Sequence, residues 1–225
     1  MGEAIGQMLP SAVGVAISPI PIVAVVLMLV SARGRVNGPA FLVGWWVGVA
    51  AVGAIMLLVA GGADASEEGE PATWASVLEL VLGVLLLLVA VKQWRGRPHE
   101  GEEAETPKWM SALDRFTPPK AAGAGVLLSG LNPKNLLLTV AGAAAIAQAG
   151  ISTGQQVVAL VVFVLIASIG VAVPIVIYFG LGDRAGPLLE RLKGWMARNN
   201  AVIMAVLLLI IGVKLIGDAI AGFSG

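Results

Sequence analysis

Six long apolar runs, separated by polar segments, make up most of the chain. Each run is long enough for an α-helix to cross the hydrocarbon of a bilayer, which takes about 20 residues. The runs lie at about 4–31, 39–61, 74–94, 121–149, 155–180 and 199–221. The pattern predicts an all-α membrane protein with six transmembrane helices.

The polar segments alternate in charge along the chain. Lys and Arg gather in the first, third and fifth segments, whereas the second and fourth, at about 62–73 and 150–154, contain neither. Twelve of the fourteen Lys and Arg obey this alternation: Arg33, Arg35, Lys92, Arg95, Arg97, Lys108, Arg115, Lys120, Arg184, Arg191, Lys193 and Arg198. Because basic loops stay cytoplasmic, we expect a plasma (inner) membrane protein with both termini outside and the 95–120 loop in the cytoplasm.

The longest polar segment divides the predicted helices into two sets of three. We expect a first three-helix repeat at 1–94, a cytoplasmic linker at 95–120 and a second three-helix repeat at 121–225. Because three is an odd number, the second set must cross the membrane in the opposite sense from the first. Inverted repeats of this kind are common in secondary transporters.

Prolines lie near the middle of the first and fourth predicted helices. The two motifs are Ser18-Pro19-Ile20-Pro21 and Asn132-Pro133-Lys134-Asn135. Proline lacks an amide donor and clashes with the preceding turn, so both helices should be kinked or broken at mid-membrane. The freed backbone groups need partners there. A substrate, an ion or water can supply them, and the alternative is an ordinary kink satisfied by neighbouring helices.

Charged side chains within the predicted helices are the other candidates for a transport path. Lys134 lies about 13 residues into the fourth helix, where a lysine costs roughly 3 kcal/mol on insertion scales. It should face the bundle interior and bind an anionic group or change protonation, unless it snorkels or pairs with a carboxylate. Lys214 and Asp218 are four residues apart and should form a salt bridge. Together with Glu79 they are accessory candidates.

Two smaller signals concern helix packing. Gly44 and Gly48 form a G-x-x-x-G pattern, which allows close helix approach either within the chain or between subunits. Pro174 predicts a further kink in the fifth helix.

Composition narrows the remaining chemistry. The chain is 58% hydrophobic and 12% charged, against about a quarter charged in soluble domains. It has no cysteine and a single histidine, His99. Gly150-Ile-Ser152-Thr-Gly154 matches a nucleophile-elbow pattern, but it falls in a loop on the side of the membrane opposite to His99. We therefore expect no enzyme activity, no metal and no cofactor, and the zero net charge argues against nucleic acid.

Three segments resemble a known family: residues 16–23 (Ala-Ile-Ser-Pro-Ile-Pro-Ile-Val), residues 41–46 (Phe-Leu-Val-Gly-Trp-Trp) and residues 129–135 (Ser-Gly-Leu-Asn-Pro-Lys-Asn). With the six-helix layout they are similar to the lysine-exporter (LysE) superfamily. Within it they look most like the GAP branch, the peptidoglycolipid- and sulfolipid-addressing proteins of mycobacterial cell envelopes. The resemblance covers nearly the whole chain.

The resemblance implies export, or assistance in export, of a cell-envelope glycolipid by six helices in two inverted triplets. It implies membrane lipids or a glycolipid substrate as ligands, and a homodimer or other envelope-export proteins as partners. Its central substrate region would comprise Ser18, Pro19, Pro21, Asn132, Pro133, Lys134 and Asn135. Amino-acid exporters of the superfamily carry Pro-Gly-Pro in the first helix, and this chain has Ile20 in place of the glycine.

Two alternatives to a glycolipid carrier stay open. One is an exporter of a small solute, such as an amino acid or a cation, for which the chain offers few intramembrane carboxylates. The other is an accessory scaffold that hands lipid to a separate export machine without transporting it.

Overall fold

The computed structural model describes residues 1–64, 73–96 and 116–224, and all regular structure in these ranges is helical. The elements are α1 (Gly2–Ala16), α2 (Pro19–Val30), α3 (Gly34–Asp64), α4 (Thr73–Arg95), α5 (Pro118–Val126), the π-helical turn η2 (Leu127–Leu131), α6 (Pro133–Gln148), α7 (Thr153–Ala167), α8 (Ile169–Leu181), the 3₁₀ turn η3 (Gly182–Arg184) and α9 (Ala185–Ser224). The predicted all-α fold is confirmed. Most of the predicted 95–120 linker, at 97–115, lies outside the described residues.

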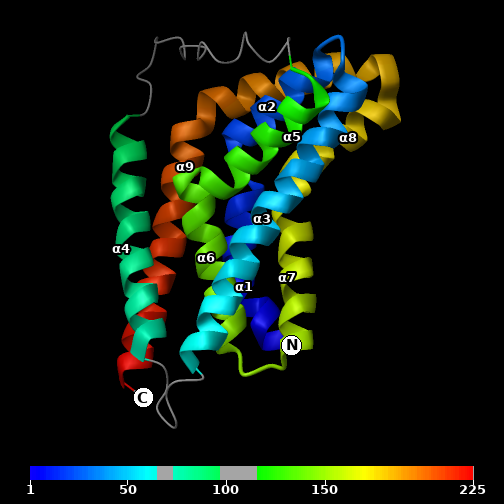
Figure 1. Ribbon diagram of the computed structural model, residues 1–225. Helices are drawn as coiled ribbons and strands as arrows, with labels where there is room; N and C mark the ends of the chain where they lie inside the picture. The colour runs from blue at the N-terminus through cyan, green and yellow to red at the C-terminus, as the bar shows by residue number, and fades with distance from the viewer. Residues whose placement is uncertain (65–72, 97–115, 225) are drawn as a thin grey trace.

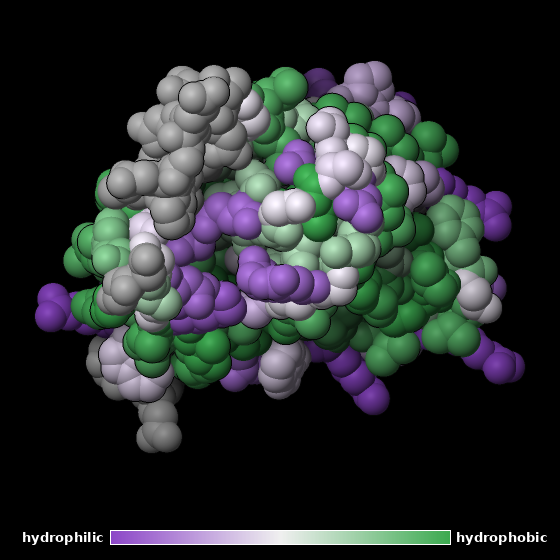
Figure 2. Space-filling model, turned by 90° about the horizontal axis from the view of Figure 1, so that it is seen from below, coloured by the Kyte–Doolittle hydropathy of each residue, from purple (hydrophilic) through white to green (hydrophobic). Residues whose placement is uncertain are grey.

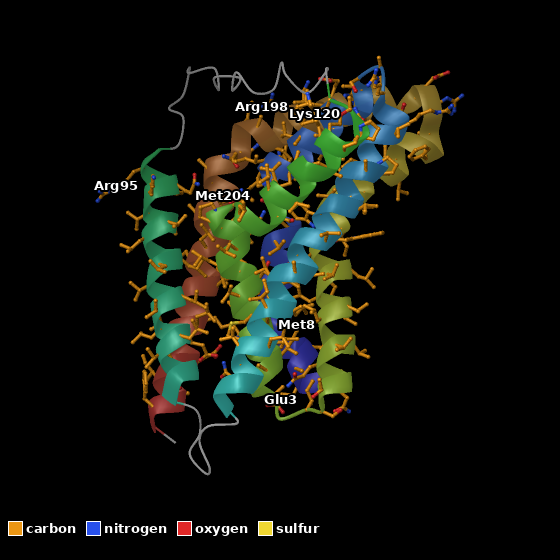
Figure 3. All side chains as sticks on the ribbon, viewed as in Figure 1. Glu3, Met8, Arg95, Lys120, Arg198 and Met204 are labelled. Atoms are coloured by element: carbon orange, nitrogen blue, oxygen red, sulfur yellow. The ribbon has the colours of Figure 1, made fainter. Side chains whose placement is uncertain are left out.

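The helices form a bundle with both chain termini at the same end (Figure 1). Glu3 lies toward that end, whereas Arg95, Lys120 and Arg198 lie toward the other (Figure 3). We call these the terminal end and the basic end. The first part of α9 runs across the basic end, and the rest descends beside α4 (Figure 1).

Most of the packing joins helices from the two halves of the sequence. Helix α1 packs on α6 and α7, α3 packs on α5 and α6, and α4 packs on α9. The buried core is apolar and includes Phe41, Trp45, Leu138 and Phe163. The two halves therefore share one main core, beside a smaller cluster of Met56, Ala60, Ala143 and Ala144.

The Gly44 and Gly48 pattern mediates packing within the chain. A Cβ built at Gly44 would overlap the carbonyl oxygen of Ala122, and one built at Gly48 would overlap the hydroxyl of Ser129. Only glycine lets the backbones of α3 and of α5–η2 approach so closely. The sequence predicted close helix contact either within the chain or between subunits, and the structure has this contact within the chain.

Three helical stretches are long and apolar enough to cross a membrane: Gly34–Gly61, Ser76–Arg95 and Ile169–Phe223. The pair α1 and α2 passes the same test together, with a bend of 50° between the two helices. The described residues thus contain three candidate spans, or four when the bent pair counts as one. Six spans remain a prediction.

The outer surface of the bundle is strongly apolar. Leu58 is 76% exposed, and Leu131 and Val176 are each 68% exposed. Many other large apolar side chains around the bundle are also exposed. Apolar exposure on this scale is unfavourable in water and normal in hydrocarbon, so the bundle is a membrane-embedded protein.

The structure has a break in the fifth predicted helix, and the kink predicted at Pro174 stays a prediction. Helix α8 runs through Pro174, and the discontinuity lies six residues earlier, at Ser168 between α7 and α8. The Ser168 hydroxyl donates to the carbonyl oxygen of Val164 at 2.6 Å. A hydroxyl bonded to a carbonyl of the preceding turn competes with the helical backbone bonds, which helps to place the break at Ser168.

Candidate functional site

The first predicted break is present between α1 and α2. Helix α1 ends at Ala16, Ser18 has extended backbone angles (φ −86°, ψ 108°), and α2 begins at Pro19. Because Pro19 and Pro21 lack amide hydrogens, they cannot bond to the carbonyls one turn earlier, as residues of a continuous helix do. Ser18, Pro19 and Pro21 are all buried, so the opened backbone lies inside the protein.

The second predicted break is present between η2 and α6. Asn132 has extended angles (φ −66°, ψ 119°), and α6 begins at Pro133. The Asn132 side-chain oxygen accepts from the amide of Lys134 at 3.2 Å and so caps α6. Across the break, the Asn135 side-chain amide donates to the carbonyl of Leu128 at 2.8 Å. The two asparagines thus replace backbone bonds that the proline removes.

The side chains at the break before α6 differ sharply in exposure. Leu131 and Pro133 are exposed, whereas Lys134 is only 3% exposed and Asn135 is fully buried. Three buried polar atoms on this inward face have no hydrogen-bond partner: Nζ of Lys134, Oδ1 of Asn135 and Oγ1 of Thr139. Buried polar groups nearly always have a hydrogen-bond partner. A polar ligand or water could supply the partners that these three atoms lack.

Thr139 was not among the predicted site residues. It lies four residues after Asn135, which places both on one face of α6. That spacing is the signal in the sequence from which Thr139 could have been predicted.

The two breaks lie at one level of the bundle. Gly14 of α1 packs against Leu138 of α6, and toward the terminal end Ser11 and Ala141 line the same cavity. The two helices therefore run antiparallel, and one more turn beyond Gly14 brings Ser18 level with Lys134. The carbonyl end of α1 thus meets the amide end of α6, two helix termini with partial charges of opposite sign.

The third break, at Ser168, lies next to the first. A Cβ built at Gly170, just after Ser168, would overlap the carbonyl oxygen of Ala16 at the end of α1. Ser168 is buried. Ser18, Ser168 and Asn135 are thus buried at or next to three helix discontinuities, and Lys134 is buried beside the one before α6. We call this region the break site.

The accessory candidates come together elsewhere, in a cavity of about 250 Å³ near the terminal end. Lys214 forms an ion pair with Asp218, as the four-residue spacing predicts. Glu79 accepts a hydrogen bond from the Gln148 side chain at 3.3 Å. The polar lining is completed by Gln7, Ser11 and Ser76. We call this the end cavity. Figure 2 shows hydrophilic side chains gathered near the middle of the terminal end.

Apolar packing separates the end cavity from the break site. Gly14 lies between them on α1. Leu138 of α6 and Ile211 of α9 pack against it. Both side chains are buried. Among the described residues, no group of three or more His, Cys, Asp or Glu side chains could hold a metal ion.

Exposed apolar side chains outside and buried polar groups at broken helices inside define an integral membrane protein with an internal polar site. The chain belongs to the family described as Sap, sulfolipid-1-addressing protein, which matches residues 8–221. This result agrees with the resemblance to the GAP branch. No curated protein and no solved structure matches the chain. Placement in the LysE superfamily stays a prediction.

Proposed function

We propose that this protein exports, or helps to export, a cell-envelope glycolipid by alternating access around the break site. The observation that carries the proposal is Lys134, a buried lysine whose Nζ has no partner, at the amide end of α6. A buried cation at the N-terminus of a helix, where the helix dipole is positive, suits an anionic group. The family description names a sulfolipid, a lipid with an anionic sulfate, which fits this chemistry.

The proposal takes the protein to have six spans. Beyond α3 and α4, these are α1–α2, α5–η2–α6, α7–α8 and the descending part of α9. Helices α5 to α6 together cover residues 118–148, which is long enough to cross a bilayer even with a break. Because basic loops stay cytoplasmic, the basic end would face the cytoplasm and the terminal end the outside.

Reciprocal packing supports inverted repeats. The second span, α3, packs on the fourth, and the fifth span packs in turn on the first through α1·α7 and α2·α8. The third and sixth spans meet at a glycine pair. A Cβ built at Gly83 would lie 2.9 Å from the Gly212 carbonyl oxygen, and one at Gly212 would lie 3.0 Å from that of Gly83. Such mutual contacts are what a two-fold relation generates.

In the proposed mechanism, one triplet rocks against the other and opens the break site to either side in turn. Lys134, at the positive end of the α6 dipole, binds the anionic part of the headgroup. The acyl chains stay against the apolar outer surface, so only the polar part of the lipid passes through the protein interior. Lys134 therefore acts as a binding residue.

The proposal is tested with purified protein in liposomes that contain a fluorescently labelled sulfated glycosyl lipid. Transfer between leaflets is followed by quenching from outside. Wild-type protein should accelerate transfer, and Lys134→Ala should abolish the acceleration while folding normally. Lys120→Ala, which removes a lysine at the basic end, is the matched control and should behave as wild type. Wild-type transfer by Lys134→Ala would remove Lys134 from the mechanism.

The same assay separates the two alternatives. The end cavity brings together Glu79 and Asp218, the two carboxylates predicted within spans, and this favours small-solute export as the second candidate. In that case lipid transfer stays at the protein-free rate, while a trapped amino acid or cation leaves the liposomes. An accessory scaffold would move neither and would need a co-purifying partner.

A further inference from the structure

The end cavity is a second polar site that the proposed mechanism does not use. Its walls come from α1, α4, α6 and α9, so it is built by both halves of the chain. A single water molecule needs roughly 10–15 Å³, and the cavity of about 250 Å³ has room for a larger polar group.

Two hydroxyls in the cavity wall have no partner among the described residues. Ser11 is 4% exposed and Ser76 is 7% exposed, and neither side chain makes a hydrogen bond. Gln148 uses one of its side-chain N–H groups on Glu79 and keeps a second N–H and its oxygen free. The cavity therefore has both hydrogen-bond donors and hydrogen-bond acceptors available to a ligand.

The charges of the wall restrict the ligand. Glu79 and Asp218 bring two negative charges, and Lys214 brings one positive charge, which leaves a net charge of −1. An anionic group would be repelled by this excess. A bare cation needs a shell of oxygen ligands, and here the Lys214 ammonium is part of the wall. An uncharged hydroxyl both donates and accepts a hydrogen bond, which matches the mixture of groups present.

We infer that the end cavity binds an uncharged, hydroxyl-rich group: a sugar or another polyol. The ligand is either the headgroup of a membrane lipid or a free sugar. A lipid headgroup as the ligand rests on the proposed function. In that case the cavity binds the neutral part of a glycolipid whose anionic part binds at the break site. A free sugar as the ligand does not depend on the proposed function.

The test uses the full chain in phosphatidylcholine nanodiscs prepared without sugar-based detergents. One arm incorporates glucosyl diacylglycerol, and the other adds methyl β-glucoside to the solution. Binding is measured by magnetisation transfer from the protein to the sugar protons in NMR, and by the shift of the thermal unfolding midpoint. A sulfated methyl glucoside tests whether negative charge excludes the ligand.

The key variant is Gln148→Leu, alone and combined with Ser76→Ala. Gln148 is exposed at the end of α6, so its replacement should not prevent folding. The double variant should bind the sugar about tenfold more weakly. Gln93→Leu, the same substitution outside the cavity, is the control and should bind as wild type.

Binding in the lipid arm alone identifies a headgroup site, and binding of methyl β-glucoside identifies a site for free sugar; both support the inference. No binding in either arm, binding that Gln148→Leu/Ser76→Ala leaves unchanged, or tighter binding of the sulfated sugar would overturn it. Lys134→Ala should keep sugar binding although it loses lipid transfer. Lipid transfer by a wild-type protein that binds no sugar would overturn this inference and leave the proposed function standing.

Discussion

Two lysines in two different helices have opposite surroundings. Lys134 at the break site is buried and its Nζ has no partner. Lys214 in the end cavity pairs with Asp218, and the two side chains are 36% and 42% exposed. A buried charge without a partner is costly, whereas a half-exposed pair is close to neutral in energy. The comparison indicates that Lys134 is kept at a cost to stability and that Lys214 is not.

The largest expected effect follows from replacing Lys134 by Met, which has similar length and no charge. Lipid transfer in liposomes should fall to the protein-free rate because the cation is lost. Stability should rise, by up to roughly 3 kcal/mol on insertion scales, because the buried charge is gone. Transfer and the thermal midpoint from circular dichroism measure the two effects on one sample. A lower midpoint would mean that Lys134 has a structural partner, and the contrast between the lysines would fail.

The next effect concerns the close packing that holds the break site together. Gly170→Ala should destabilise the protein by about 1–3 kcal/mol, because the new methyl group would overlap the Ala16 carbonyl. Gly180→Ala in the same helix is the control. It has open space around it, and it should be neutral or slightly stabilising. Equal midpoints for the two variants would contradict the contact between α1 and α8.

A smaller effect is expected at Asn135. Asn135→Ala removes the hydrogen bond to the Leu128 carbonyl and should cost about 1–2 kcal/mol. The loss should appear as faster amide exchange in η2 and at the start of α6, measured by hydrogen–deuterium exchange mass spectrometry. Protection in α4 should stay the same. Uniform loss across the bundle would argue against a local role at the break.

The smallest effect is expected at the end cavity. Asp218→Asn removes the carboxylate of a partly exposed ion pair and should change stability by no more than about 1 kcal/mol. The thermal midpoint should move little, and less still at high salt, because exposed charges are screened. A drop as large as that of Gly170→Ala would show that the ion pair of Lys214 and Asp218 stabilises the fold strongly, and the two lysines would then differ less than proposed.

The features that the sequence could predict are those set by covalent chemistry or by spacing along one helix. Prolines cannot donate, so the breaks at Ser18 and Asn132 were predictable. The ion pair of Lys214 and Asp218 followed from their four-residue spacing. The close approach at Gly44 and Gly48 followed from the absence of side chains.

The features that could not be predicted depend on how helices align with one another. No proline marks the break at Ser168, and Pro174 lies inside α8. Nothing in the chain order says that Glu79 and Gln148 meet, because the register between α4 and α6 comes from tertiary packing. The same holds for Ser18 and Lys134, whose common level follows from the contact between Gly14 and Leu138.

The contact at Gly14 also bears on whether protons can leak through the protein. Lys134 lies on one side of it along α6 and the end cavity on the other, and Leu138 and Ile211 pack on Gly14 between them. Apolar side chains that pack this closely leave no room for water, so protons have no continuous chain of hydrogen bonds to follow. We expect Leu138→Ala to let water through this apolar layer and so to let protons leak across the membrane.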